Sequence, residues 1–132
     1  MRARGPAVLL AFGVVTIAGV MLWQWRPEPA TRPLHVPELL AEALAGKRAF
    51  DLYCARCHGE NAAGTPAGPS LVHRTYQPAL HADVAFELAV RRGARAHHWR
   101  FGDMPPERAV SQVEVTQITR YVRELQRANG IE

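Results

Sequence analysis

A pair of cysteines followed directly by a histidine constrains this chain more than any other stretch. Cys54 and Cys57 lie three residues apart, and His58 adjoins the second thiol. Two thiols at this spacing can each add to a vinyl group of a haem, and the neighbouring imidazole can then face the iron. The chain has no further cysteine, so no disulfide framework is available to staple a small domain. A covalently bound haem can be that staple.

The same motif is compatible with two other kinds of chemistry. A zinc site would need a fourth ligand, which His73 or His81 could supply. A thioredoxin-like dithiol would need a strand–helix–strand setting, and no stretch alternates apolar and polar residues for long enough to predict a sheet. Covalent haem is favoured because an apolar export segment precedes the motif and a methionine suited to iron follows it.

Residues 46–59 resemble the start of a class I, single-haem cytochrome c. The resemblance implies an all-α fold, with about three to four helices around one haem c bound through the two cysteines, over residues 37–132. It also implies that Gly46 and Phe50 meet the C-terminal helix. A glycine inside a helix is unfavourable by about 1 kcal/mol, so a break into two short helices at Gly46 is the alternative.

A second resemblance to that family lies in the segment Phe101-Gly102-Asp103-Met104-Pro105-Pro106. It implies that the Met104 thioether is the second axial ligand of the iron, with His58 as the first. Methionine–histidine ligation raises the reduction potential. A methionine that only packs in the core is the alternative, and His97 and His98 are rival ligands that would lower the potential.

Further haem contacts are also implied by the resemblance. The segment Gly68-Pro69-Ser70-Leu71 matches one in which the proline carbonyl, here that of Pro69, accepts the Nδ1–H of the haem histidine. Such a bond leaves Nε2 for the metal. Leu71 would pack on the porphyrin, and an ordinary turn is the alternative. Hydrogen-bond donors to the haem propionates are expected among Tyr76, Arg95, Trp99 and Arg100.

An uncharged run of 19 residues extends from Ala7 to Trp25. As a helix it would span roughly 28 Å, close to the thickness of a bilayer core. Trp23 and Trp25 end the run, and indoles favour the water–lipid boundary. We therefore expect residues 1–25 to be a transmembrane anchor. A cleaved signal peptide is the alternative, although its apolar core usually has only about 7 to 15 residues.

The rest of the chain is then expected outside the cytoplasm. Arg2 and Arg4 precede the apolar run and indicate a cytoplasmic N-terminus. Residues 26–36 are a proline-rich linker, and residues 37–132 are the haem domain. The expected location is the bacterial inner membrane, with lipid contacts through residues 7–25 and the haem domain on the periplasmic face.

The net charge of +4 is concentrated near the N-terminus. Residues 1–36 contain four arginines and one glutamate, whereas residues 37–132 contain twelve basic and eleven acidic side chains. A nearly neutral globular part does not indicate nucleic-acid binding. Four arginines between positions 91 and 100 are either a docking patch for an acidic partner or charges that complement a helix C-terminus. We favour the second interpretation, and the oligomeric state stays unknown.

Three helices are expected around the motif and a long loop. The first covers residues 37–53, the second covers residues 83–92 with Asp83 as its cap, and the last follows a capping box from Ser111 to Glu114. Residues 60–78 are the loop, rich in glycine and proline. The side chains expected to face the core are Leu40, Leu44, Phe50, Val84, Phe86, Leu88, Val115, Ile118, Val122 and Leu125.

These features predict a single-electron carrier for redox protein partners at or near the membrane. Because both axial positions of the iron would be filled, a substrate would have no place on the metal, and we do not expect an enzyme. One alternative is a peroxidase-like haem enzyme or gas sensor in which the methionine leaves readily. Another is the haem subunit of a larger oxidoreductase complex.

Overall fold

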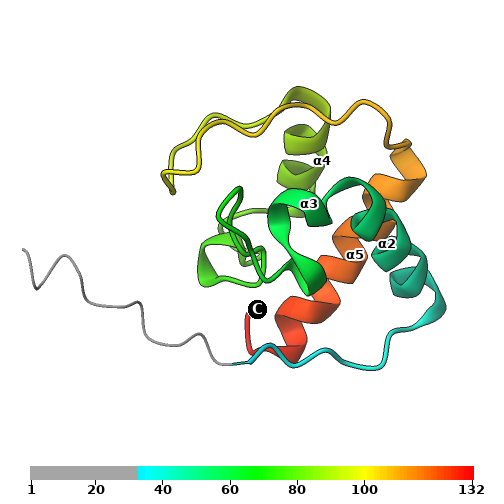
Figure 1. Cartoon of the computed structure of the whole chain (residues 1–132). Helices are drawn as coiled ribbons and strands as arrows, with labels where there is room; N and C mark the ends of the chain where they lie inside the picture. Colours follow the sequence, from blue (N-terminus) through cyan, green and yellow to red (C-terminus); the bar gives the residue numbers. More distant parts are fainter. Residues whose placement is uncertain (1–32) are drawn as a thin grey trace, which may run out of the picture. The chain divides into compact units, whose positions relative to one another are not determined.

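The computed structural model describes residues 33–132, which contain four α-helices and no β-strand. The elements in chain order are α2 (Ala41–Tyr53), α3 (Ala55–His58), the 3-10 turns η1 (Glu60–Ala62) and η2 (Arg74–Tyr76), α4 (Asp83–Arg92) and α5 (Gln112–Ala128), as Figure 1 shows. The expected all-α fold is confirmed for this part of the chain.

The expected anchor at residues 1–25 and most of the linker at 26–36 lie outside the described residues. Among residues 33–132, no helix combines the length and the apolar character needed to cross a membrane. The described end of the linker is held by α5: the His35 N–H donates to Asn129 Oδ1 at 2.9 Å, and Asn129 Nδ2 donates to the His35 carbonyl at 2.8 Å.

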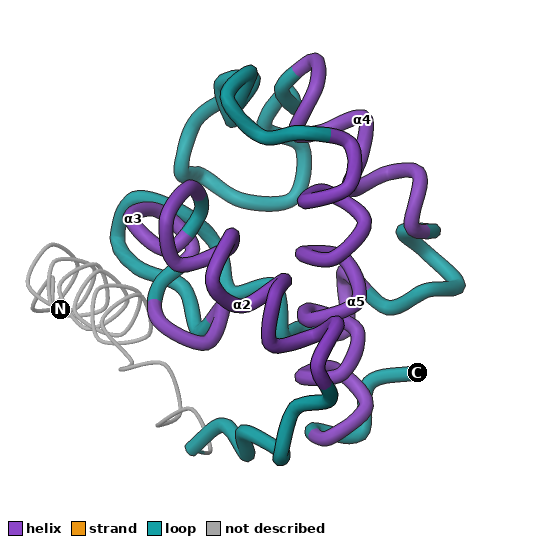
Figure 2. Tube along the Cα trace, turned by 90° about the vertical axis from the view of Figure 1, so that its right-hand side faces the viewer, coloured by secondary structure: helices purple, strands orange, loops and turns teal. Residues whose placement is uncertain are grey.

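The core forms where α2 crosses α5 (Figure 2). Gly46 lies at the crossing, and a Cβ on it would be 2.0 Å from the Gln117 carbonyl oxygen. Further along α2, Phe50 packs edge-to-face against Tyr121 with ring centroids 5.5 Å apart. The predicted contact of Gly46 and Phe50 with the C-terminal helix is thus confirmed. The alternative of a break at Gly46 is wrong, because α2 continues to Tyr53.

The N-terminal part of α2 differs from the prediction. The helix begins at Ala41 rather than at residue 37, and its buried residues are Ala43, Gly46, Ala49 and Phe50. Leu40 and Leu44 are 74% and 44% exposed, so their predicted burial is wrong. The face toward α5 carries small residues because the two backbones approach closely there, and the leucines are left outside that contact.

Helix α5 follows the prediction closely. Ser111 Oγ accepts a hydrogen bond from the Glu114 N–H, and Glu114 Oε2 accepts one from the Ser111 N–H at 2.8 Å, which completes the capping box. Its predicted core positions Val115, Ile118, Val122 and Leu125 are all buried. The apolar stripe therefore directs this helix into the core as expected.

Helix α4 has the expected bounds but a different cap. Its N-cap is Ala82, and Asp83 lies in the first turn, where its carboxylate accepts a hydrogen bond from Arg123 Nε at 2.8 Å. Asp83 is thus tied to α5 instead of capping its own helix. Gly93 follows the last residue of the helix with φ = 75°, so the helix ends at the predicted residue 92. Val84 is 58% exposed, so its predicted burial is wrong.

The two other predicted positions of α4 are only partly covered. Phe86 is half-buried, with the Arg123 guanidinium carbon 4.7 Å from its ring centroid. Leu88 is 41% exposed because it lines a cavity rather than a filled core. The predicted burial of Leu88 is therefore wrong, although the side chain points inward, toward the cavity, as predicted.

Two polar side chains of α5 hold the long loop. Arg123 is only 6% exposed and donates to the carbonyls of Tyr76 and His81 and to Gln126 Oε1. Gln126 is fully buried, and its Nε2 donates to the Leu71 carbonyl at 2.8 Å and to that of Tyr76 at 3.1 Å. The loop is therefore fixed by hydrogen bonds to α5, a feature that the apolar pattern does not predict.

Replacement of Gly46 by alanine should destabilise the protein. The added methyl group would collide with the backbone of α5, and overpacking of this kind costs about 1–3 kcal/mol. Urea unfolding followed by circular dichroism measures the change. Arg48→Ala, on the exposed side of α2, is the control and should stay within about 0.5 kcal/mol of the wild type. Stabilisation by Gly46→Ala, as for an exposed helical glycine, would contradict the close crossing.

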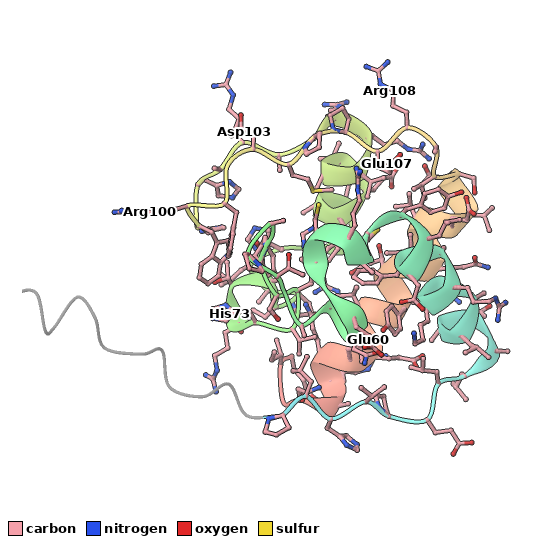
Figure 3. All side chains as sticks on the ribbon, in the orientation of Figure 1. Glu60, His73, Arg100, Asp103, Glu107 and Arg108 are labelled. Atoms are coloured by element: carbon pink, nitrogen blue, oxygen red, sulfur yellow. The ribbon has the colours of Figure 1, made fainter. Side chains whose placement is uncertain are left out.

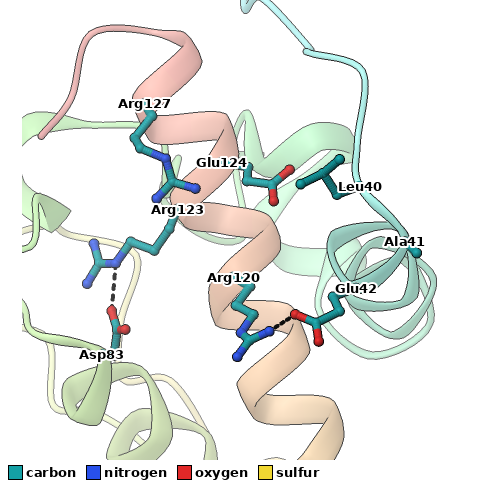
Figure 4. Close-up of a pocket in the computed structure, with 8 residues that line it drawn as sticks. All are labelled: Leu40, Ala41, Glu42, Asp83, Arg120, Arg123, Glu124 and Arg127. Carbon is teal, nitrogen blue, oxygen red and sulfur yellow. Dashed lines mark hydrogen bonds and ion pairs between the residues drawn. The ribbon is translucent and has the colours of Figure 1, made fainter.

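Arg123 and Arg120 form a matched pair for a second test (Figure 4). Arg123→Met should cost about 3 kcal/mol in free energy of unfolding, because several carbonyl oxygens lose their buried donor. Arg120 pairs with Glu42 at the surface and is 55% exposed, so Arg120→Met should change stability by less than about 1 kcal/mol. Equal losses in the two variants, measured by urea unfolding, would contradict the role given to Arg123.

Candidate functional site

A largely apolar cavity of about 360 Å³ lies among α4, α5 and the segment that follows α2. Phe50, Leu71, Val90, Val115 and Ile118 are among the apolar side chains that form its walls. The polar or sulfur-bearing side chains that reach it are Cys54, His58, Tyr76, His81, His97, Met104 and Thr119. The cavity therefore brings residues of the cysteine motif together with the methionine of the distant segment.

The cysteine motif is held by a short helical turn directly after α2. Cys54 separates α2 from α3, and its carbonyl accepts hydrogen bonds from the N–H groups of Cys57 at 3.1 Å and His58 at 2.9 Å. Both thiols are half-buried and free of disulfide bonds. Burial raises the pKa of Cys54 to about 11, with smaller contributions from Glu107 and Cys57. The Cys54 thiol is thus neutral at the mouth of an apolar cavity.

The imidazole of His58 is oriented by the following loop. Its Nδ1 lies 2.9 Å from the Pro69 carbonyl oxygen, so the hydrogen bond expected from the resemblance is present. Because a carbonyl only accepts, Nδ1 carries the proton and Nε2 is left with a free lone pair. Burial lowers the pKa of His58, and the bond to Pro69 acts in the opposite direction. The arrangement favours a neutral imidazole able to bind a metal.

The close approach of the loop to the motif depends on Gly68. A Cβ on this residue would lie 2.9 Å from the Cys57 carbonyl oxygen. The same carbonyl accepts a hydrogen bond from Thr65 Oγ1 at 2.6 Å. Gly68 and Thr65 thus place Pro69 against His58.

Met104 is fixed by its backbone. Its N–H donates to the Ala94 carbonyl at 2.8 Å, and the Ala94 N–H donates to the Met104 carbonyl at 3.0 Å. Gly93 makes this approach possible, because a Cβ there would be 2.5 Å from the Met104 carbonyl oxygen. The half-buried Met104 side chain lines the same cavity as His58.

Three further predicted site residues line this cavity or a smaller one that shares residues with it. Leu71 and Tyr76 line the cavity, and Trp99 Nε1 donates to the Tyr76 hydroxyl at 2.9 Å. Trp99 also lines a smaller cavity of about 80 Å³ that shares His58 and Met104 with the larger one. Burial raises the pKa of the Tyr76 hydroxyl, and the bond from Trp99 partly opposes this.

Two of the four arginines between positions 91 and 100, Arg91 and Arg100, take different positions. Arg100 is exposed and extends away from the fold (Figure 3), and it lines neither cavity. Arg91 donates to the Val110 carbonyl and to Gln112 Oε1, both at 2.9 Å, and so joins α4 to the start of α5. Arg91 is therefore a structural residue rather than part of an open docking patch.

The structure does not assemble the zinc site considered as an alternative. Among residues 33–132, the group of histidines, cysteines and carboxylates close enough to share a metal ion is His81, His97 and His98. That group contains neither cysteine. The apolar walls from Phe50, Val115 and Ile118 were predicted only as core, and no local pattern in the sequence distinguishes a core residue from a cavity wall.

Comparison with known proteins gives one match. The family model described as cytochrome c matches residues 43–126, well over half of the chain and nearly all of the described helices. Neither a curated protein nor a solved structure matches the chain.

Proposed function

The chain belongs to the cytochrome c family, and we propose that it is a single-electron carrier of an exported redox chain. Haem c is its cofactor, and the family attaches this group covalently through a cysteine pair, here Cys54 and Cys57. When bound, the haem supplies an iron centre that changes by one electron.

The described residues fit this cofactor. The cavity is walled by apolar side chains, and the two thiols stand at the spacing needed for two thioether bonds. The hydrogen bond to Pro69 leaves His58 Nε2 free for the iron. The presence of Met104 and His58 in one cavity is the observation that carries the proposal, because together these two side chains would hold the haem iron.

The contacts that hold the Met104 backbone argue against the alternative of a haem enzyme or gas sensor. A labile methionine would open a position on the iron, and His97 would be a polar group near it. The paired hydrogen bonds to Ala94 and the close contact at Gly93 hold the Met104 backbone in place. A fixed ligand keeps substrate off the iron and limits reorganisation on electron transfer, so both features favour a carrier.

The location and partners form part of the same proposal. Residues 1–25 would anchor the chain in the bacterial inner membrane, and residues 26–36 would space the haem domain from the periplasmic face. The support is the uncharged run from Ala7 to Trp25 in the sequence. The partners would be redox proteins at or near that membrane. Co-purification from gently solubilised membranes distinguishes a free carrier from a subunit of a larger complex.

Removal of both thiols should abolish covalent attachment. In Cys54→Ala/Cys57→Ala, haem should be extracted by acidified organic solvent, whereas the wild type should keep one haem per chain under the same treatment. Intact-protein mass spectrometry and haem staining of denaturing gels measure this. Ala55→Ser is the control between the two thiols and should keep its haem. Haem that stays attached to the double variant would contradict the assignment.

Met104→Leu keeps the size of the side chain and removes the sulfur ligand. The far-red charge-transfer band of methionine-ligated ferric haem should disappear. The reduction potential should fall by on the order of 0.1 V, within the ~0.8 V range set by axial ligands. Optical redox titration measures both effects.

Two further spectra complete this test. His97→Gln should keep the band and the potential, because His97 is not the proposed ligand. A high-spin ferric spectrum of the wild type at neutral pH would contradict the closed iron site and favour the haem enzyme or gas sensor. Loss of a low-spin spectrum in His97→Gln alone would instead favour ligation by two histidines.

A further inference from the structure

Three histidines converge at the cavity, and two of them, His81 and His97, line it. His81 comes from the segment before α4, and His97 and His98 come from the loop before Met104. The ring centroids of His97 and His98 are 4.1 Å apart, and those of His81 and His98 are 5.2 Å apart. One ring nitrogen from each residue lies within 4.8 Å of the others.

Backbone carbonyls fix the proton on two of these rings. His81 Nδ1 lies 2.7 Å from the Thr75 carbonyl oxygen, and His97 Nδ1 lies 2.6 Å from that of Arg95. A carbonyl only accepts, so each Nδ1 is the donor, and in the neutral ring Nε2 is an acceptor. The His98 side chain has no hydrogen bond within the described part of the chain.

The hydrogen bonds of these rings bear on the charge of a ligand that they could bind. A carboxylate or phosphate would need donors, and the Nδ1–H groups of His81 and His97 already donate to the backbone. A metal cation instead accepts the free lone pairs. In a metal-bound histidine, the ring nitrogen that does not bind the metal commonly donates to a backbone carbonyl. This hydrogen bond sets the tautomer and the ring orientation.

We propose that His81, His97 and His98 form a binding site for a divalent ion of the zinc and copper class. Three imidazoles suit these ions better than Ca²⁺ or Mg²⁺, which prefer oxygen ligands. A site with three protein ligands leaves a fourth tetrahedral position for water.

The scaffold positions the ligands before a metal binds. The loop that carries His97 and His98 is closed at its base by the Ala94–Met104 pairing, and within it the Ala96 N–H donates to Asp103 Oδ1 at 2.8 Å. The backbone of His81 is held through its carbonyl by Arg123. Metal–nitrogen bonds of about 2.0–2.1 Å require the nitrogens to approach to roughly 3.3 Å. The exposed side chains of His97 and His98 have room to do so.

Two of these histidines, His81 and His97, also line the larger cavity. The proposed site nevertheless uses neither cysteine, nor His58, nor Met104. Zn²⁺ binding is therefore measured separately from the haem spectrum, so the failure of this proposal can be distinguished from the failure of the proposed function.

Titration with Zn²⁺ alone tests the proposal. The haem-loaded full-length chain, solubilised in detergent, freed of metal by a chelator and prepared without a histidine tag, is titrated in a calorimeter. We expect one equivalent of Zn²⁺ to bind with a micromolar or lower dissociation constant. His97→Gln and His98→Gln should each weaken binding at least tenfold, because each removes one of three ligands.

His35→Gln is the matched control, since the hydrogen bonds of His35 use its backbone and its side chain lies outside the cluster. Its Zn²⁺ affinity should equal that of the wild type. X-ray absorption at the zinc edge should show three imidazole nitrogens at about 2.0–2.1 Å. Far-ultraviolet circular dichroism shows that each variant is folded.

Three results would overturn the proposal. They are the absence of saturable Zn²⁺ binding to the wild type, an unchanged affinity in both His97→Gln and His98→Gln, and an equal loss in His35→Gln. The His98 variant gives a reliable answer even if other variants unfold, because the His98 side chain is exposed and makes no hydrogen bond in the described residues.

Discussion

The close contact between the backbones of α2 and α5 at Gly46 sets the position of the rest of the site. It brings Phe50 against Tyr121 and buries both rings completely. Because α3 follows α2 after a single residue, the same contact also places Cys54 and His58. The walls of the cavity then come from both helices, with Phe50 on α2 and Ile118 on α5. A bulkier residue at Gly46 would move the cysteine motif as well as the helix that carries it.

The second constraint is polar and acts on the opposite side of α5. Arg123 and Gln126 donate hydrogen bonds to carbonyls of a loop whose own buried apolar side chains are Ala62 and Val72. A buried arginine is costly unless its donors are all used, and here they meet two carbonyls, a carboxylate and an amide. These bonds position Tyr76 and His81, so the polar side of α5 builds one edge of the cavity while its apolar side builds the core.

The sequence predicts those parts of the fold that depend on local pattern. The capping box and the apolar stripe of α5 are each defined by a few neighbouring residues, and both agree with the structure. The burial of Leu40 and Leu44 was predicted from hydrophobicity, and it fails because the helix crossing selects small side chains rather than large apolar ones. The role of Arg123 was missed, because an arginine on a helix gives no local sign that its partners are loop carbonyls.

The loop before Met104 shows why part of the site could not be predicted from sequence. Its resemblance to a ligand loop pointed to the sulfur, whereas the pairing of Ala94 with Met104 and the contact at Gly93 become visible only in three dimensions. That pairing holds the Met104 backbone without any help from the iron. The same pairing closes the loop that brings His97 and His98 to His81, although His81 is distant in sequence. One short backbone bridge therefore supports both the proposed iron ligand and the three-histidine cluster.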